Sequence, residues 1–214
     1  MDEESDLGFA ALMCSRLCHD LVSPVGAITN GIELLAEEDD PEMISQVMDL
    51  LRQSASQTSN RLQFFRLAFG MAGGFGSSID LREAHKSLSV FFSDNQVELD
   101  WEAEPKLVRK DCVKILLIMA MIAGDGLIRG GVVKINLDTS DDQISINVLA
   151  EGPRFIMQEV FQKALIGDLK REDLEPRTSP AFLAGKLAKG LGTKIEVKPV
   201  AETGIHLNLE LPNS

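Results

Sequence analysis

His19 and the residues that follow it are the part of the chain whose types and spacing most clearly suggest chemistry. The chain has three histidines, and His19 is followed directly by Asp20 and, five residues on, by Pro24. A neutral imidazole is nucleophilic at physiological pH. In a helix, Pro24 would leave the backbone carbonyl of Asp20 without its usual donor. A histidine on a helix surface is more often solvated and without a chemical role, so a His19 that takes part in no reaction stays open as an alternative to a nucleophilic one.

Two nearby cysteines raise the possibility of a metal site. Cys14 and Cys18 are four residues apart, and His19 adjoins the second of them. Cys14 lies among apolar residues at helical spacing, whereas His19 points elsewhere. We therefore expect two small buried thiols rather than a metal centre.

Two long helices are predicted to carry these residues. Apolar side chains recur at steps of three or four from Leu7 to Leu35, which indicates a helix of about thirty residues. An acidic run ends it, and Asp40 followed by Pro41 is typical of the start of a second helix. A second apolar stripe runs from Ile44 to Phe69 through Val47, Leu51, Ala55, Thr58, Leu62 and Phe65. Residues 1–70 are therefore predicted to form an antiparallel helical hairpin.

His19 is predicted to face solvent from this hairpin. It lies two residues from Leu17 and two from Leu21, which places it about 200° from the apolar stripe. One hairpin cannot bury two full stripes, so we expect two copies to pair into a four-helix bundle. The alternative is that the stripes dock on the second half of the same chain.

The second half of the chain has a different pattern. A Gly-rich linker is expected over residues 71–78, followed by a domain over residues 79–214. We expect an α+β sandwich made of an antiparallel sheet with helices on one face. The expected helices are 79–93, 109–128, 155–166 and 179–191, and the expected strands are 96–101, 132–138, 143–149, 193–200 and 205–211.

Composition limits the partners and the compartment. The chain has 214 residues and a formal net charge of −12, with 44% hydrophobic and 25% charged residues. Such a charge disfavours binding to nucleic acid or to an anionic membrane. Three cysteines, an acidic N-terminus and the absence of a long apolar run predict a cytoplasmic protein without disulfides.

The segment His19-Asp20-Leu21-Val22-Ser23-Pro24 resembles the H box of sensor histidine kinases. It lies on the first helix of a hairpin that precedes an α+β domain of suitable size. The resemblance therefore extends to the dimerisation and histidine phosphotransfer hairpin and to the Bergerat-type ATP-binding domain. It implies that His19 carries a phosphoryl group and that Asp20 holds the other ring nitrogen.

Three nucleotide-binding features of these kinases are missing. The segment from Ile115 to Asp125 contains no asparagine where the magnesium-binding helix of the family carries one. The aspartate turn is reduced to Glu151-Gly152, and the glycine-rich lid is replaced by the segment from Arg177 to Phe182. This combination resembles the ChpT-type histidine phosphotransferases of alphaproteobacteria, which are homodimers with a degenerate ATP-binding domain.

The resemblance implies a relay protein that binds no ATP. It would take a phosphoryl group from the receiver aspartate of a hybrid histidine kinase of the CckA type. It would pass the group to response regulators of the CtrA and CpdR type. No cofactor is expected in this chain, because the receiver would supply Mg²⁺. The receiver is expected to dock beside His19, on Ser15, Arg16, Val22, Ser23 and Gly26.

Several points stay open at this stage. Ser23 stands where the family often has Thr or Asn acting on a water, and Arg16 could contact phosphate or be a solvated charge. Two other functions remain in play. One is an active histidine kinase with a divergent nucleotide pocket, and the other is a dimeric scaffold in which His19 is inert.

Overall fold

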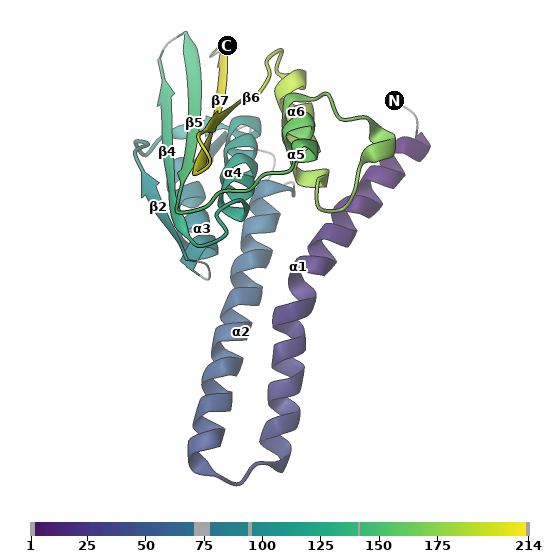
Figure 1. Ribbon diagram of the computed structural model, residues 1–214, viewed down its shortest axis with the longest axis vertical. Helices are drawn as coiled ribbons and strands as arrows, with labels where there is room; N and C mark the ends of the chain where they lie inside the picture. Colours follow the sequence, from purple (N-terminus) through teal and green to yellow (C-terminus); the bar gives the residue numbers. More distant parts are fainter. Residues whose placement is uncertain (1–2, 71–77, 94–95, 141, 213–214) are drawn as a thin grey trace. The chain divides into compact units, whose positions relative to one another are not determined.

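The computed structural model describes residues 3–70, 78–93, 96–140 and 142–212, and these form two compact units, Met1–Phe65 and Arg66–Ser214 (Figure 1). Helix α1 (Glu3–Glu37) and helix α2 (Pro41–Ala68) form an antiparallel hairpin, as predicted. The expected linker at residues 71–78 lies, except for Ser78, outside the described residues.

The turn between the two helices is built from carboxylates. Glu38 Oε1 accepts the backbone N–H groups of Asp39 and Asp40 at 3.1 and 3.0 Å. Asp40 Oδ1 accepts the N–H of Glu42 at 3.0 Å, and Pro41 occupies the first position of α2. The N-cap predicted from the sequence is therefore present, and it satisfies a donor that has no partner within the helix.

The inner face of α2 differs from the predicted stripe. A row of buried and half-buried side chains follows it at steps of three and four, through Ile44, Val47, Leu51, Ser54, Thr58, Arg61 and Phe65. Ser54 and Arg61 thus take the places that we expected for Ala55 and Leu62, which are exposed. Hydrophobicity favoured the neighbouring residues, but Arg61 is held on the inner face by a hydrogen bond to α1.

The second unit is built on a five-stranded sheet in the order β2-β4-β5-β7-β6. Its strands are β2 (Val97–Trp101), β4 (Gly131–Thr139), β5 (Gln143–Glu151), β6 (Glu196–Val200) and β7 (Gly204–Pro212). Strands β4, β5, β7 and β6 pair antiparallel as expected, but β2 pairs with β4 in parallel. The prediction of a wholly antiparallel sheet was wrong here. The chain returns from β2 to β4 through a helical crossover, and such a crossover joins parallel strands.

The remaining elements complete an α+β fold. The helices are α3 (Leu81–Ser93), α4 (Lys110–Asp125), α5 (Glu159–Ile166) and α6 (Ser179–Gly190), with a 3-10 turn at η1 (Arg171–Asp173). A small sheet of β1 (Ser78–Asp80) and β3 (Leu107–Arg109) was not predicted. Helix α5 begins four residues later than expected, because Phe155 forms an isolated bridge with Leu127 instead.

The core of this unit lies between the sheet and α4. Alternate residues of β5 are buried, which are Ile144, Ile146, Val148 and Ala150. Helix α4 is buried on every side from Ile115 to Gly124. Burial of one sheet face by helices is the arrangement that the sequence pattern predicted.

Candidate functional site

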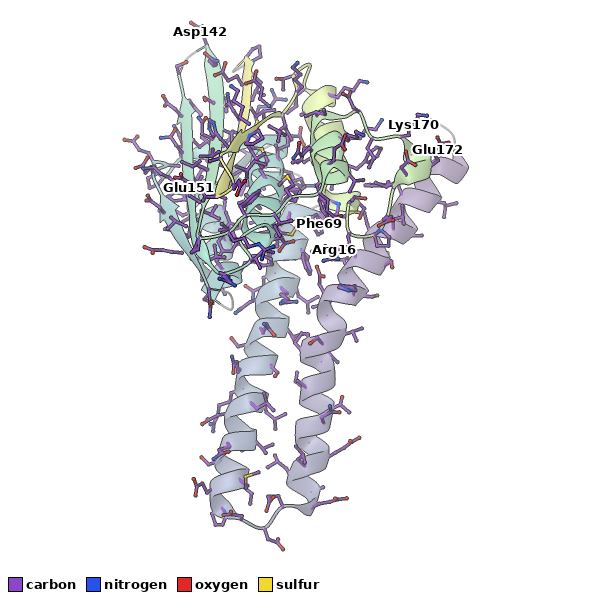
Figure 2. The ribbon with its side chains drawn as sticks, in the orientation of Figure 1. Arg16, Phe69, Asp142, Glu151, Lys170 and Glu172 are labelled. Atoms are coloured by element: carbon purple, nitrogen blue, oxygen red, sulfur yellow. The ribbon has the colours of Figure 1, made fainter. Side chains whose placement is uncertain are left out.

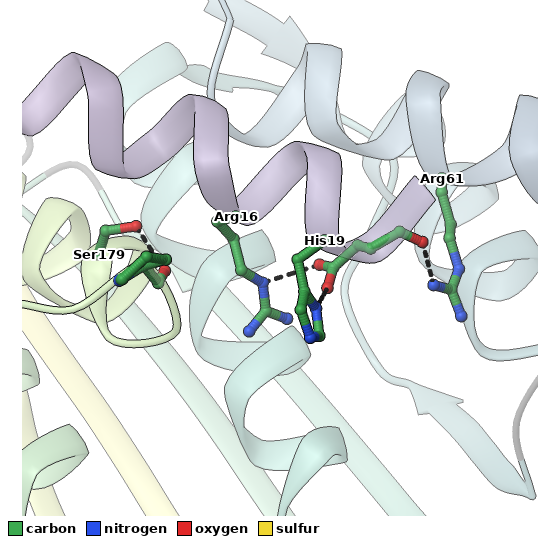
Figure 3. Close-up of polar contacts among 6 residues, drawn as sticks. Arg16, His19, Arg61 and Ser179 are labelled. Atoms are coloured by element: carbon green, nitrogen blue, oxygen red, sulfur yellow. Dashed lines mark hydrogen bonds and ion pairs between the residues drawn. The ribbon is translucent and has the colours of Figure 1, made fainter. Parts of the chain in front are cut away.

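The His19 imidazole projects from α1 into solvent with one nitrogen engaged. Its side chain is 69% exposed, and Nδ1 lies 3.1 Å from Asp20 Oδ1 (Figure 3). An ionised carboxylate can only accept a hydrogen bond, so Nδ1 carries the ring proton and Nε2 carries the lone pair. Among the described residues, Nε2 has no hydrogen-bond partner. The exposed nitrogen is therefore the nucleophilic one.

The Asp20 carboxylate is held on its other side by Arg16. Arg16 Nε donates to Asp20 Oδ2 at 2.7 Å, and the two side chains are only 11% and 12% exposed. The residues are one helical turn apart, the spacing at which opposite charges meet on a helix. Arg16 is therefore not the solvated surface charge considered as an alternative. Its guanidinium fixes the carboxylate that orients His19.

Pro24 creates the gap in the helix that the sequence predicted, and Arg61 fills it. Pro24 lies buried inside α1, where it has no N–H to donate to the carbonyl of Asp20. Arg61 Nη1 of α2 donates to this carbonyl oxygen at 2.6 Å (Figure 3). A hydrogen bond to a charged group contributes about 1.5–3 kcal/mol. The sequence pointed to the carbonyl but not to Arg61, whose only signal was a basic residue beside the expected stripe.

The other residues expected near His19 leave an open surface. Ser15, Val22 and Ser23 are exposed, and the Val22 side chain is 68% exposed although it is apolar. Gly26 is half-buried, and a Cβ atom built on it would meet nothing within 4 Å. These residues lie three, four or seven positions from His19 and share its helical face.

The cysteines do not behave as expected. Cys14 and Cys18 are both exposed, so the prediction of buried thiols was wrong. Helix α2 covers only the adjoining face of α1, which leaves the stripe that contains Cys14 open in the single chain. Cys112 in α4 is buried, and its burial raises the pKa of the thiol to about 11. Within the described ranges no three His, Cys, Asp or Glu side chains converge as metal ligands.

The second unit lacks polar groups where the related kinases bind Mg²⁺ and nucleotide. Every side chain of α4 from Ile115 to Gly124 is apolar, including Ile122 and Ala123, and the segment is buried. Apolar side chains cannot supply the oxygen ligands that Mg²⁺ requires. Glu151 ends β5 on the surface of this unit (Figure 2), and Gly152 packs so closely that a Cβ would come within 2.4 Å of the Gly130 carbonyl.

A pocket of about 560 Å³ lies beside α5 in the second unit, but its charge is unsuited to a nucleotide. It is lined from α5 to the segment after η1 by Glu159, Val160, Lys163, Leu169, Glu172, Asp173, Leu174 and Glu175. Lys163 is already paired with Glu159 at 2.8 Å. The surplus of carboxylates would repel a triphosphate.

Comparisons with known proteins identify the class. Residues 81–203 match the family described as the histidine phosphotransferase C-terminal domain. The chain is 36% identical over 198 residues to the protein phosphotransferase ChpT of Brucella abortus (strain 2308), covering 92% of this chain and 93% of the relative. The chain therefore belongs to the histidine phosphotransferase family.

Solved structures agree with this assignment. A bacterial phosphotransferase structure superposes with a TM-score of 0.84 at 33% identity, covering 95% of this chain and 96% of the other. The histidine kinase ThkA, solved in complex with the response regulator protein TrrA, superposes with a TM-score of 0.53 at 17% identity, covering 99% of this chain and 64% of that one. The second likeness shows the shared histidine kinase fold. In the part of the chain that the structure describes, no helix has the length and hydropathy needed to cross a bilayer.

Proposed function

We propose that this protein relays a phosphoryl group through His19. The group would come from the receiver aspartate of a hybrid histidine kinase and pass to the receiver domains of response regulators. The observation that carries the proposal is the exposed Nε2 of His19, opposite an Nδ1 that is bound to a largely buried carboxylate. Membership of the histidine phosphotransferase family supports the same chemistry.

The transfer step uses the groups already described. The Nε2 lone pair attacks the phosphorus of the aspartyl phosphate, an N–P bond forms, and the P–O bond breaks with its electron pair leaving on the receiver carboxylate. The ring keeps its Nδ1 proton and therefore gains positive charge. The Asp20 carboxylate 3.1 Å away offsets that charge in the transition state. Return of the group to another receiver is the same step reversed.

We place the receiver on the face of α1 around His19. Ser15, Val22 and Ser23 are exposed there, and Gly26 leaves room for a partner's side chain. Arg16 borders this face while holding Asp20. The Mg²⁺ ion that neutralises the phosphoryl oxygens would sit in the acidic pocket of the receiver, so this chain needs no cofactor.

The partners we propose are those that the resemblance implies. They are a donor of the CckA type and acceptors of the CtrA and CpdR type, and the similarity to a protein phosphotransferase supports the transfer itself. The ThkA structure contains a histidine kinase with a response regulator, a partnership of the kind proposed here. The net charge of −12 favours receivers whose docking face is basic.

We further propose that the chain works without ATP. The buried apolar stretch of α4 has no side-chain oxygen ligand for Mg²⁺, and the pocket beside α5 carries four carboxylates against one lysine. Both features oppose the binding of a metal-nucleotide complex. An active kinase would need an oxygen ligand for Mg²⁺ on this stretch of α4.

We also propose a homodimer formed by the hairpin. A second apolar face lies beside the inner face: on α1 it includes Leu7, Cys14, Val25 and Ile32, and on α2 it includes Met48, Ala55 and Leu62. Most of these positions are seven residues apart, the repeat of a helix seam. His19 lies about 120° or more from this face, so pairing would leave the imidazole accessible.

The proposal is tested by phosphotransfer profiling with purified receivers. A receiver phosphorylated on its aspartate should pass acid-labile label to this chain, and His19→Ala should accept none. His85→Ala is the matched control, because His85 is an exposed histidine that stacks on Trp101 in the second unit. Labelling of the His19→Ala protein at the native level would refute the site.

The alternatives predict different results in the same assay. An active kinase would become labelled from ATP alone and would show saturable nucleotide binding. An inert scaffold would take no label from any receiver. The relay proposed here takes label from a receiver and none from ATP.

A further inference from the structure

Arg61 is linked to His19 through a short chain of contacts that crosses between the two helices. Arg61 Nη1 donates to the backbone oxygen of Asp20 at 2.6 Å. The Asp20 carboxylate in turn accepts a hydrogen bond from His19 Nδ1 at 3.1 Å. We propose that Arg61 is a positioning residue, which fixes Asp20 and thereby the tautomer and direction of the His19 ring. This inference rests on the proposed function of His19.

The need for such a residue comes from Pro24. A regular helix would hold the Asp20 carbonyl through the N–H of residue 24, but proline has none. A half-buried carbonyl without a donor is costly, and helices bend where this ladder is broken. Bending at Asp20 would turn its carboxylate away from Nδ1. The donor from α2 removes that freedom.

The position of Arg61 on α2 supports this role. It occupies the inner face of the hairpin, where neighbouring positions carry Thr58 and Phe65. An apolar side chain would pack at such a position with less desolvation than a guanidinium. Only a long donor side chain also reaches the carbonyl of the facing helix. Arg61 therefore packs less favourably than an apolar residue would, but it holds the Asp20 carbonyl in place.

Loss of Arg61 should slow phosphoryl transfer without preventing docking. In single-turnover transfer from an aspartate-phosphorylated receiver domain, Arg61→Ala should lower the maximal rate about tenfold and leave the half-saturating receiver concentration unchanged. Arg61→Lys keeps a donor of shorter reach, so its maximal rate should lie between those of the native protein and Arg61→Ala. Arg52→Ala is the matched control, since Arg52 lies exposed on the same helix and bonds Asp49 at the surface. A native rate in Arg61→Ala would overturn the inference.

A spectroscopic readout tests positioning without any transfer. In protein labelled with ¹⁵N-histidine, the two ring nitrogens of His19 report the tautomer. The native protein should show protonated Nδ1, and Arg61→Ala should show a mixture of both tautomers at the same pH. An unchanged tautomer would overturn the inference. If the native protein instead shows this tautomer but accepts no phosphoryl group, the proposed function fails while the role of Arg61 stands.

A double-mutant cycle identifies the carbonyl as the point of action. Pro24→Ala restores an N–H that can bond the Asp20 oxygen within α1. In that background, Arg61→Ala should cost less than about twofold, because the carbonyl keeps a donor. A full tenfold loss in the Pro24→Ala protein would show that Arg61 acts by another route.

Discussion

At the scale of single residues, one carboxylate decides which nitrogen of His19 is available. Asp20 uses Oδ1 for the ring and Oδ2 for Arg16, while its backbone oxygen receives Arg61. All three contacts leave Nε2 pointing to solvent. An exposed histidine, which is ordinarily free to rotate and to exchange tautomers, is thereby held in one orientation.

Replacing Asp20 with asparagine should test this arrangement directly. The amide keeps the size of the side chain but loses the charge that offsets the phosphorylated ring, so transfer should slow about tenfold or more. Single-turnover rates measure the loss. Asp49→Asn, a surface carboxylate on α2 paired with Arg52, is the control and should transfer at the native rate. Native transfer by Asp20→Asn would contradict the role of the charge.

The cysteines give a second prediction at this scale. The pKa of Cys112 is raised to about 11 by burial, so its thiol stays protonated near pH 8 and should resist iodoacetamide. Cys14 and Cys18 are exposed and should react first, unless pairing of two hairpins covers them. Mass spectrometry after brief labelling identifies the modified residues. Fast labelling of Cys112 in the folded protein would contradict its burial.

The same burial has a pH consequence. The folded protein keeps the Cys112 proton above pH 9.0, the ordinary value, whereas the unfolded chain releases it. Folding therefore gains stability from this group below pH 9, and that contribution is lost as the pH rises toward about 11. Denaturant unfolding should show a smaller alkaline loss of stability in Cys112→Ala than in the native chain. If the free energy of unfolding fell equally with alkaline pH in both proteins, the Cys112 thiol would not be the cause.

At the scale of helices and strands, features set by neighbouring residues were easier to predict than contacts between distant segments. The Asp40–Pro41 helix start and the alternation of β5 follow from neighbouring residues, and both are present. The parallel pairing of β2 with β4 depends on where a crossover returns, which no short pattern encodes. Arg61 was missed for a similar reason, because its partner Asp20 is 41 residues away.

Two glycines of α1 should separate packing from docking. A Cβ at Gly31 would lie 2.8 Å from Leu51 Cδ2, whereas a Cβ at Gly26 meets nothing within 4 Å. Gly31→Leu should therefore lose about 1–3 kcal/mol through overpacking, partly offset by better helix propensity. Gly26→Leu should keep or gain stability but slow transfer from the receiver. Urea unfolding measures the stability of each variant, and single-turnover rates measure transfer. A Gly31→Leu protein more stable than Gly26→Leu would contradict the packing around these two glycines.

At the scale of the whole molecule, the hairpin carries two separate faces. One surrounds His19, and the other contains Ile32 at 58% exposure and Leu62 at 50%. A chain with a net charge of −12 repels its own copies, so the proposed pairing would depend on the apolar area of the second face.

Charges placed on each face should therefore have different effects. Ile32→Glu should yield monomers in sedimentation velocity, because pairing would bury the new carboxylate without a partner. Val22→Glu lies on the His19 face and should stay dimeric while receiver transfer slows. A monomeric Val22→Glu protein, or a fully dimeric Ile32→Glu protein, would reverse the assignment of the two faces.

In the proposed relay, the single exposed nitrogen of His19 would also set the kinetic order. Because donor and acceptor would approach the same Nε2 from the same side, they could not be bound to one imidazole together, and turnover would follow a ping-pong course. The unphosphorylated donor would then compete with every acceptor for the docking face around His19. The relative abundance of the receivers, rather than any device within this chain, would govern which way phosphate travels.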